Sequence, residues 1–428
     1  MFLTKEDPRA QIKGSRDPLG IQPIWYRLGR HVIANLTTQS NSARGFTILL
    51  LGRYLTERLL DDGAIENEAV VDTFLHTEQI GAYVRHLQHG VEGDIRGIDR
   101  VRAKAQRSSR RIPIDSGAEG KILSDQKLYG LWGLFSSPAR VSGLIEEGPI
   151  GTVADAHIFI ETNYWPRLKE VYGSLSNLLC NGGLLNGTKP DAVFSAFSDI
   201  LADQFTDEER AFYTEYLLDG IHVSPYPLKH QGLLVQLMRE NISLNDTLGR
   251  NEFQRLRDLA KTKDEQLHRR LDQIVRAESV FAIAMVIFEY SLSLDGHSIA
   301  DVQRSLSNRW GRVIPNIDTA KNTDILEEIK SIYTDIEIAV HFDQCQRALQ
   351  DARFDDVLEI LVAWNKLTQA RRGSAPWLRI NAQGRLDVRY RSPAQILPAA
   401  EELPNLWRYR YFLPSVQNIA RQLTDEAA

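Results

Sequence analysis

The residues of this sequence best suited to binding chemistry are arginines and lysines crowded into one segment. Between Arg85 and Arg111 there are eight basic residues and three acidic ones, a local net charge of +5. Basic side chains at this density can neutralise the phosphates of a nucleic acid and release its counterions without reading its sequence. The candidate nucleic-acid-binding residues in this segment are Arg96, Arg100, Arg102, Lys104, Arg107, Arg110 and Arg111.

The same segment allows two other interpretations, a solvated helix face and a surface for an acidic partner protein. Aromatic residues, on which single-stranded bases stack, are not interleaved with these arginines. The whole chain has 51 basic and 56 acidic residues and a net charge of −5, so it exerts no general attraction on polyanions. Any affinity for nucleic acid must therefore come from a local patch.

Directly after the basic segment, residues 124–165 have the order of elements of a winged helix-turn-helix. Apolar residues recur at helical spacing up to Phe135, and Ser136-Ser137-Pro138 predicts a break followed by a second helix. A strand of a wing is expected at residues 150–153. The segment therefore predicts a winged-helix-like module.

Arg140 is the basic residue of the expected second helix, and Glu146 and Glu147 follow it. Helices that read DNA usually present several donors to phosphates and base edges. We therefore add Arg140 to the candidates for nucleic-acid contact, while a module that only packs against its neighbours remains the alternative.

A second group of basic and aromatic residues lies near the end of the sequence. Residues 377–390 alternate apolar and polar positions around a turn at 381–384, which predicts a β-hairpin. A stretch rich in aromatic residues and arginine follows at 405–412. The candidate partner-binding residues of this group are Arg379, Arg389, Trp407, Arg408 and Arg410.

The sequence contains no catalytic motif. A Gly-x-x-x-x-Gly-Lys-Ser/Thr loop, a Gly-x-Gly-x-x-Gly loop and a Gly-x-Ser-x-Gly turn are all missing. His76, His86 and His89 lack the further ligands that a zinc site needs. No metal and no cofactor is expected, and the sequence favours a protein that is not an enzyme.

Three carboxylates near the middle of an expected helix are the remaining candidates for binding a metal ion. Asp335, Glu337 and Asp343 could bind a divalent cation or transfer protons. A helix this rich in charge is usually solvated, and no lysine can be placed beside these acids. An unrecognised metal-dependent nuclease therefore stays open only as an alternative.

The sequence predicts a soluble, cytoplasmic protein without a membrane partner. Cys180 and Cys345 lie far apart and have no metal-like spacing, which is typical of a reducing compartment. The first residues turn acidic at once and do not resemble a signal peptide. The longest apolar run, Val280–Phe288, is too short to span a membrane.

Periodicity and turn residues predict a mainly α, multidomain helical protein with a winged-helix-like module and a small C-terminal α+β portion. Helices are expected at 43–60, 66–89, 191–205, 324–353 and 357–367, and one or two at 251–290. Four consecutive regions are expected: an N-terminal helical domain with the basic segment (1–120), the winged-helix-like module (121–170), a helical domain (171–355) and a helix–hairpin–helix region (356–428).

Three short motifs occur in the first 150 residues: Arg16-Asp17-x-Leu19-Gly20-Ile21, the polar turn 37–42 with Arg44 before an apolar helix, and residues 129–134 (YGLWGL). In these motifs the chain resembles a group of uncharacterised bacterial proteins encoded beside helicases and nucleases in anti-phage defence islands. The resemblance implies a subunit of a bacterial defence assembly, and it carries over no catalytic residue.

Together these observations favour a non-enzymatic accessory subunit of a bacterial anti-phage defence or genome-maintenance complex. Such a subunit would bind DNA, a partner protein or both. The alternatives are a structural adaptor that joins proteins without touching nucleic acid, and the unrecognised nuclease. The sequence does not decide between DNA and RNA.

Overall fold

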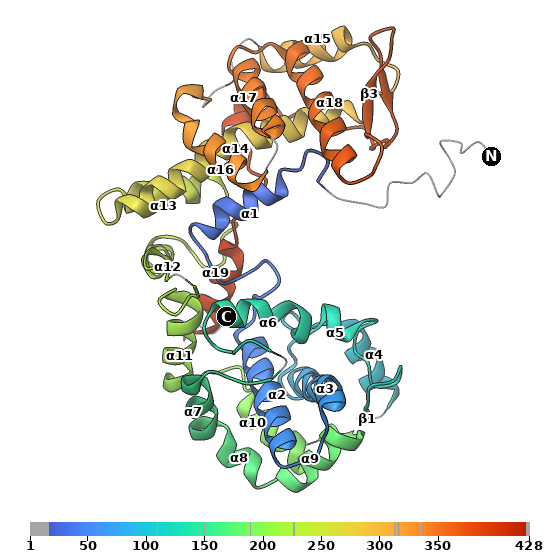
Figure 1. Cartoon of the computed structure of the whole chain (residues 1–428), viewed down its shortest axis with the longest axis vertical. Coiled ribbons are helices and arrows are strands. Elements are labelled where there is room, and N and C mark those ends of the chain that lie inside the picture. Colours follow the sequence, from blue (N-terminus) through green and yellow to red (C-terminus); the bar gives the residue numbers. More distant parts are fainter. Residues whose placement is uncertain are drawn as a thin grey trace, which may run out of the picture. The chain divides into compact units, whose positions relative to one another are not determined.

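The computed structural model describes residues 17–108, 110–148, 150–188, 190–225, 227–311, 314, 317–333 and 336–424. These residues form nineteen α-helices and two small two-stranded sheets, so the expected mainly α fold is confirmed (Figure 1). The chain divides into two compact units. Unit 1 contains the described part of Met1–Val32 together with Thr247–Tyr411, and unit 2 contains Ile33–Asp246 together with the described part of Phe412–Ala428.

This division differs from the four consecutive regions expected from the sequence. Each unit is built from two stretches that are far apart in the chain, because the chain passes from one unit to the other after Val32, Asp246 and Tyr411. Boundaries at residues 120 and 170 would both fall inside unit 2, and a boundary at 355 would fall inside unit 1.

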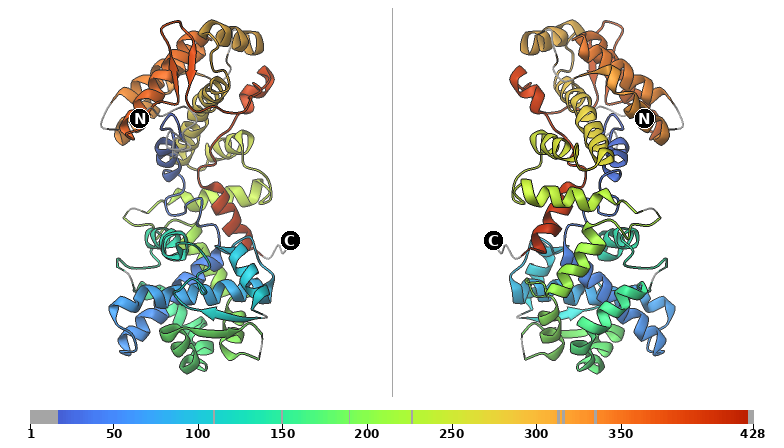
Figure 2. Two further views of the ribbon diagram at one scale, coloured as in Figure 1. Left: turned by 90° about the vertical axis from the view of Figure 1, so that its right-hand side faces the viewer. Right: turned by 90° about the vertical axis from the view of Figure 1, so that its left-hand side faces the viewer.

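The described residues of unit 2 form helices and one antiparallel strand pair, in which Ile112 lies opposite Leu185. The two strands are cyan and green in Figure 2. The elements of unit 2 are α2 (Ala43–Asp61), η2 (Asn67–Ala69), α3 (Val70–His89), α4 (Ile98–Arg107), β1 (Arg111–Ile114), α5 (Gln126–Tyr129), α6 (Leu131–Val141), α7 (Ala154–Asn163), α8 (Trp165–Lys169), α9 (Tyr172–Asn181), β2 (Gly183–Asn186), α10 (Ala192–Ile200), α11 (Asp207–Tyr213), η3 (Thr214–Leu218), α12 (His230–Asn241) and α19 (Leu413–Gln422).

Helices α2 and α3 lie side by side at the centre of unit 2 (Figure 1). Their close approach depends on two glycines, because a Cβ atom on Gly52 would lie 2.8 Å from the ring of Phe74, and one on Gly81 would lie 2.8 Å from Ile48. α2 begins at Ser42, whose hydroxyl accepts a hydrogen bond from the Gly45 amide at 2.9 Å. Side chains on almost every face of α2 are buried, as its apolar centre predicts.

Unit 1 is a helical bundle with a short hairpin, which confirms the predicted turn at 381–384. In this hairpin Arg379 pairs with Asp387. The elements of unit 1 are α1 (Gln22–Arg30), α13 (Arg250–Ala260), α14 (Glu265–Ser291), α15 (Ile299–Trp310), η4 (Thr319–Lys321), α16 (Thr323–Ile332), α17 (Glu337–Gln350), α18 (Phe354–Arg371), β3 (Leu378–Ile380), β4 (Leu386–Val388) and η5 (Ala400–Asn405).

The long helix α14 forms the centre of unit 1. Eight of the nine residues in Val280–Phe288 are buried, and the helix contacts α1, α13, α16, α17 and α18.

The described N-terminal stretch is bound to α18 by hydrogen bonds. Asn365 donates to the carbonyl of Pro18 at 2.8 Å, and Thr368 donates to that of Leu19 at 3.0 Å.

The predicted break at Ser136-Ser137-Pro138 is wrong, because α6 continues through it from Leu131 to Val141. Proline removes one backbone hydrogen bond and costs roughly 3 kcal/mol inside a helix. The buried side chains of Phe135 and Ala139, on either side of the break, offset this cost by packing in the core. The expected wing is reduced to a single bridge between Ile145 and Thr152, so a winged-helix shape is not confirmed.

The predicted continuous helix 324–353 is also wrong. It is divided into α16 and α17, and the apolar side chains of Ile336 and Val340 are 61% and 43% exposed. The apolar residues that face inward in α16 therefore do not continue as one buried face through α17. The stretch 251–290 is two helices, α13 and α14.

Candidate nucleic-acid interface

Helix α4 carries the basic segment on its exposed side. Val101 and Ala105 are buried, and the helix packs against α3 and β1. It begins after Gly97, whose φ of +74° lies in the left-handed region. Any residue with a Cβ atom at position 97 would place that atom 2.2 Å from the carbonyl oxygen of Ile122. Glycine is therefore required here, and this close approach fixes where α4 starts.

Four arginines of the segment are exposed, and within the described part of the chain their side chains have no hydrogen bond or ion pair. We call Arg100, Arg107, Arg110 and Arg111 the arginine strip. Arg100 and Arg107 are seven residues apart on α4, so they share one face about 10 Å apart along the helix axis. Arg110 and Arg111 follow at the turn into β1, where the amide of Arg111 donates to the carbonyl of Ser108 at 2.9 Å.

The other three predicted cations of the segment are engaged inside the protein. Arg102 pairs with Glu92 at 2.6 Å, and Arg96 donates to the carbonyl of Gln39 at 3.1 Å. The ammonium of Lys104 donates to the carbonyls of Ala118 and Lys121, each at 2.9 Å, and burial lowers the pKa of Lys104. These three side chains therefore bind within the protein, and the arginine strip is the part of the predicted cluster that is left exposed.

Arg140 belongs to a different part of unit 2. It lies on α6, where its Nε atom is 3.6 Å from the carboxylate of Glu147. Its neighbour Arg53 is buried and donates to the carbonyl of Gly148 at 3.1 Å, and burial, with the charge of Arg140, lowers the pKa of Arg53 to about 10. Arg140 therefore does not lie beside the arginine strip, and its contact with nucleic acid stays a prediction.

The partner-binding candidates lie on two separate elements of unit 1. Arg379 and Arg389 are exposed at the β3–β4 hairpin, and the amide of Arg389 donates to the carbonyl of Trp377 at 2.9 Å. Their use in partner binding stays a prediction.

The remaining partner-binding candidates belong to the segment that packs on α13 and α14. The ring of Trp407 is half-buried and lies 4.6 Å from that of Phe253, so this indole packs against α13. Arg408 pairs with Glu289 at 2.6 Å. Arg410 is exposed and remains a candidate.

The histidines serve the fold. The Nδ1 atom of His76 donates a hydrogen bond to the carbonyl of Leu179 at 2.8 Å, and the Nε2 atom of His89 donates one to the carbonyl of Ser198 at 3.1 Å. Asp343 is engaged by Arg347 at 3.0 Å, and Asp335 lies outside the described residues. Among the residues that the structure describes, no group of three or more metal-ligating side chains is placed to hold a metal ion.

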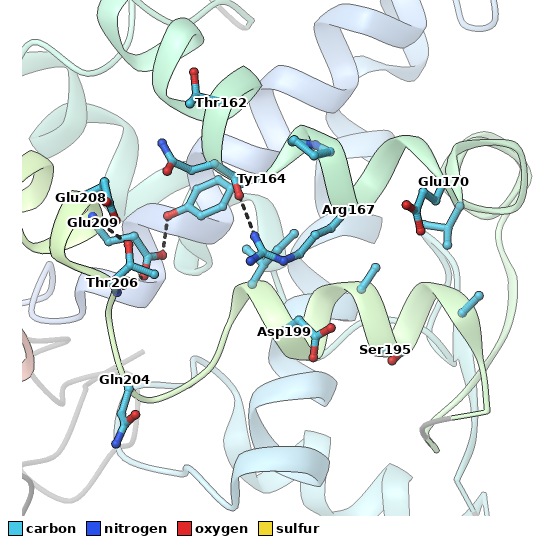
Figure 3. Close-up of a pocket in the computed structure, with 16 residues that line it drawn as sticks. Thr162, Tyr164, Arg167, Glu170, Ser195, Asp199, Gln204, Thr206, Glu208 and Glu209 are labelled. Carbon is cyan, nitrogen blue, oxygen red and sulfur yellow. Dashed lines mark hydrogen bonds between the residues drawn. The ribbon is translucent and has the colours of Figure 1, made fainter.

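A polar groove of about 880 Å³ opens on unit 2 between α7–α8 and α10–α11 (Figure 3). Its exposed residues include Arg167, Asp199 and Glu208, and Arg167 donates to the carbonyl of Asn163 at 2.7 Å. Sequence reasoning missed this groove because its lining comes from four separate helices. No pair of groups within hydrogen-bonding reach resembles a nucleophile and its base, so the groove gives no indication of catalysis.

One wall of the groove is a buried polar network. Glu209 accepts hydrogen bonds from Arg44 at 2.6 Å and from the hydroxyl of Tyr164 at 2.7 Å. It also completes a capping box with Thr206 at the start of α11. Arg44 donates in addition to two carbonyls, those of Ala202 at 2.8 Å and Gln204 at 2.9 Å. This network therefore ties α2 to the loop before α11.

Comparisons with known proteins identify no relative: no protein-family model, no curated protein and no solved structure matches the chain. Within the described ranges, every helix is too short or too polar to cross a membrane. The fold and the site thus define a two-unit, mainly helical protein with an exposed arginine strip.

Proposed function

We propose that the protein binds the phosphate backbone of a nucleic acid through the arginine strip. The observation that supports this proposal is a group of four exposed arginines from α4 to the start of β1, in a chain whose net charge is −5. Among the residues that the structure describes, none provides these four side chains with a hydrogen bond or an ion pair. Guanidinium groups are well suited to phosphate because their planar donors can form paired hydrogen bonds with its oxygens. The Arg100–Arg107 distance of about 10 Å matches about three phosphates of one strand, measured along the axis of a duplex.

The strip is suited to backbone contact, and nothing in it favours base reading. The strip lies on α4, on the turn that follows it and on the first residue of β1, and α4 packs against α3. Binding would therefore be insensitive to sequence and strongly dependent on salt. In keeping with the sequence resemblance, we place this activity in an accessory subunit of a bacterial defence or genome-maintenance complex.

The test is charge reversal in the strip of the full chain. The variant Arg107→Glu/Arg110→Glu/Arg111→Glu should bind duplex DNA far more weakly than the unmodified protein. Because three phosphate contacts are removed, the slope of log affinity against log salt should become shallower by about 3. Fluorescence anisotropy with a labelled duplex at several salt concentrations measures both quantities.

A matched control is available on the other basic surface. Arg379→Glu/Arg385→Glu/Arg389→Glu makes the same charge change at the exposed β3–β4 hairpin. This variant should retain the affinity and the salt slope. Equal binding by the strip variant and the unmodified protein would overturn the proposed interface, and loss of binding in the hairpin variant alone would transfer it to unit 1.

The proposed place in a complex has its own test. Affinity-tagged protein, purified from a bacterial host that encodes it and treated with nuclease, should retain a protein partner. Retention that is lost in the hairpin variant but kept in the strip variant would assign partner binding to Arg379 and Arg389. A tagged protein that elutes alone after nuclease treatment would contradict the accessory role while leaving nucleic-acid binding intact.

A further inference from the structure

A groove of about 270 Å³ follows strand β2 in unit 2 and has no role in the function proposed above. It is lined by β2 itself, by α9 and by the first turn of α10. Within the described residues β2 pairs with β1 alone, so its second edge is not covered by another strand. The groove and this open edge belong to the same surface of the molecule.

The register of the sheet fixes which backbone groups of β2 point away from β1. In an antiparallel pair, opposite residues alternate between positions that exchange hydrogen bonds and positions that do not. The amide of Gly187 donates to the carbonyl of Arg110 at 2.7 Å, which makes this a hydrogen-bonded position. Three residues along the strand, Leu184 lies opposite Pro113 and therefore takes a position of the other kind. Its N–H and C=O groups point away from β1.

A neighbouring backbone group shows that this outer edge faces the groove. Asn186 lies two residues after Leu184, so its N–H points the same way. That N–H donates to Oδ2 of Asp191 at 3.2 Å, and Asp191 caps α10 and lines the groove. Among the described residues, no group forms a hydrogen bond with the outward N–H and C=O groups of Leu184. A donor and an acceptor of the backbone are therefore open to the groove.

The sequence of β2 contains none of the residues that usually protect an open edge. Edge strands commonly carry a lysine or another charge, or a proline, and these prevent a further strand from adding. The stretch from Gly182 to Gly187 has no charged residue and no proline. Leu184 is also 60% exposed, so an apolar side chain stands at the open position. The edge is therefore suited to pairing with another chain.

We propose that the open edge of β2 binds an extended peptide segment of a partner protein, which adds to the sheet as a third strand. The peptide backbone pairs with the N–H and C=O groups of Leu184, and an apolar side chain of the peptide packs against the Leu184 side chain. The site is independent of the arginine strip, since none of the four strip residues lines the groove.

The surroundings of the edge favour a single uncharged segment. The charged residue of the described lining is Asp191, whose two oxygens already accept hydrogen bonds from the amides of Asn186 and Phe194. Helices α9 and α10 both contact β2 and border the groove. A second copy of the protein would bring its own α9 and α10 against them, whereas one extended chain needs only the width of a strand.

A phage-displayed library of random heptapeptides, selected on the full chain, supplies the probe. Enriched peptides, synthesised with a fluorescent label, should bind the unmodified protein saturably in anisotropy measurements. Leu184→Lys should weaken them at least tenfold, because it removes the apolar contact and places a charge at the edge. Leu128→Lys, at a leucine of α5 that is 53% exposed, should leave the affinity unchanged. A library that yields no peptide dependent on Leu184 would overturn the proposal.

Methylation of single amides in the selected peptide tests backbone pairing without altering the protein. In a bound strand, successive N–H groups point alternately toward β2 and away from it. Methylation of the amide that faces Leu184 should weaken binding at least tenfold, and methylation of the next amide should have little effect. Equal effects at both amides would contradict strand addition. Hydrogen exchange of the Leu184 amide should also slow when the peptide binds, and unchanged exchange would contradict the pairing.

Two further measurements separate this site from the nucleic-acid interface and from self-association. Leu184→Lys should leave duplex binding unchanged, and Arg107→Glu/Arg110→Glu/Arg111→Glu should leave peptide binding unchanged, so either proposal can fail without the other. Sedimentation velocity at several protein concentrations should give the same oligomeric state for Leu184→Lys and the unmodified protein. A dimer that dissociates in Leu184→Lys would assign the edge to a second copy and overturn the proposed peptide partner.

Discussion

An Arg44→Met variant is expected to lose roughly 3–5 kcal/mol of the free energy of unfolding. Arg44 and Glu209 are both buried, with side-chain exposures of 2% and 5%, and their charged groups are 2.6 Å apart. Methionine would fill much of the space of the arginine stem but would leave the Glu209 carboxylate without its counter-ion. The two carbonyls that Arg44 holds, at Ala202 and Gln204, would also lose a donor.

Urea denaturation of the full chain measures this loss, and a double variant identifies its cause. Arg44→Met/Glu209→Gln should recover part of the stability, because the unpaired buried charge is then gone. Arg304→Met, at a side chain that is 70% exposed, should change the free energy of unfolding by less than about 0.5 kcal/mol. A loss below about 1 kcal/mol in Arg44→Met would show that the buried pair contributes little.

The second large effect concerns pH. Glu78 on α3 and Glu278 on α14 are fully buried, and burial, the main cause, raises the pKa of each carboxyl from 4.5 to about 7. Hydrogen bonds from Gln126 and the Leu131 amide partly oppose the shift at Glu78. At Glu278 the opposing donors are the Arg408 amide and the Tyr411 hydroxyl, with the nearby charge of Arg250.

The sign of the effect follows from proton binding. Each folded carboxyl binds its proton more tightly than the unfolded one, so this contribution to stability is fully present below pH 4.5 and is lost as the pH rises through 7. Between pH 5.5 and 8 each carboxyl should cost roughly 2 kcal/mol of the free energy of unfolding.

Comparison of variants isolates these two carboxyls from all other titrating groups. Urea denaturation of Glu78→Gln/Glu278→Gln should show a fall between pH 5.5 and 8 that is smaller than that of the unmodified protein by roughly 4 kcal/mol. Glu327→Gln, at an exposed carboxylate of α16, should leave the pH dependence unchanged. Parallel pH profiles for the double variant and the unmodified protein would contradict raised pKa values at both carboxyls.

Elements with a strong local signal were predicted well. The helix at 43–60 and the buried centre of α14 have apolar residues on almost every face, so few other placements could bury them. The start of α11 was readable because Thr206 and Glu209 form a capping box within four residues. The β3–β4 hairpin was readable because its strands alternate in polarity and are joined by a short turn.

Elements that depend on distant contacts were not predictable. β1 and β2 are four residues long, and each pairs with a strand that lies far away in the sequence. The packing of Phe135 and Ala139 keeps Pro138 within α6, although proline locally favours a break. The division into two units could not be inferred either, because each unit combines stretches that lie far apart in the sequence.

The candidate site was predicted in part. Helical spacing places Arg100, Lys104 and Arg107 on one face of α4 and Arg102 on another. The sequence therefore already indicated that Arg102 would have surroundings different from those of the arginine strip. No local pattern in the sequence indicates that Lys104 donates hydrogen bonds to the carbonyls of the loop at residues 118–121.

The contribution of α19 to unit 2 has a consequence for synthesis on the ribosome. Residues Ile33–Asp246 emerge well before Leu413–Gln422, and the whole of Thr247–Tyr411 is translated in between. At roughly 5–20 residues per second, the first part of unit 2 waits on the order of ten to thirty seconds for its last helix. During that time the apolar residues of α12 that α19 covers are exposed, so the nascent chain is a natural client for chaperones.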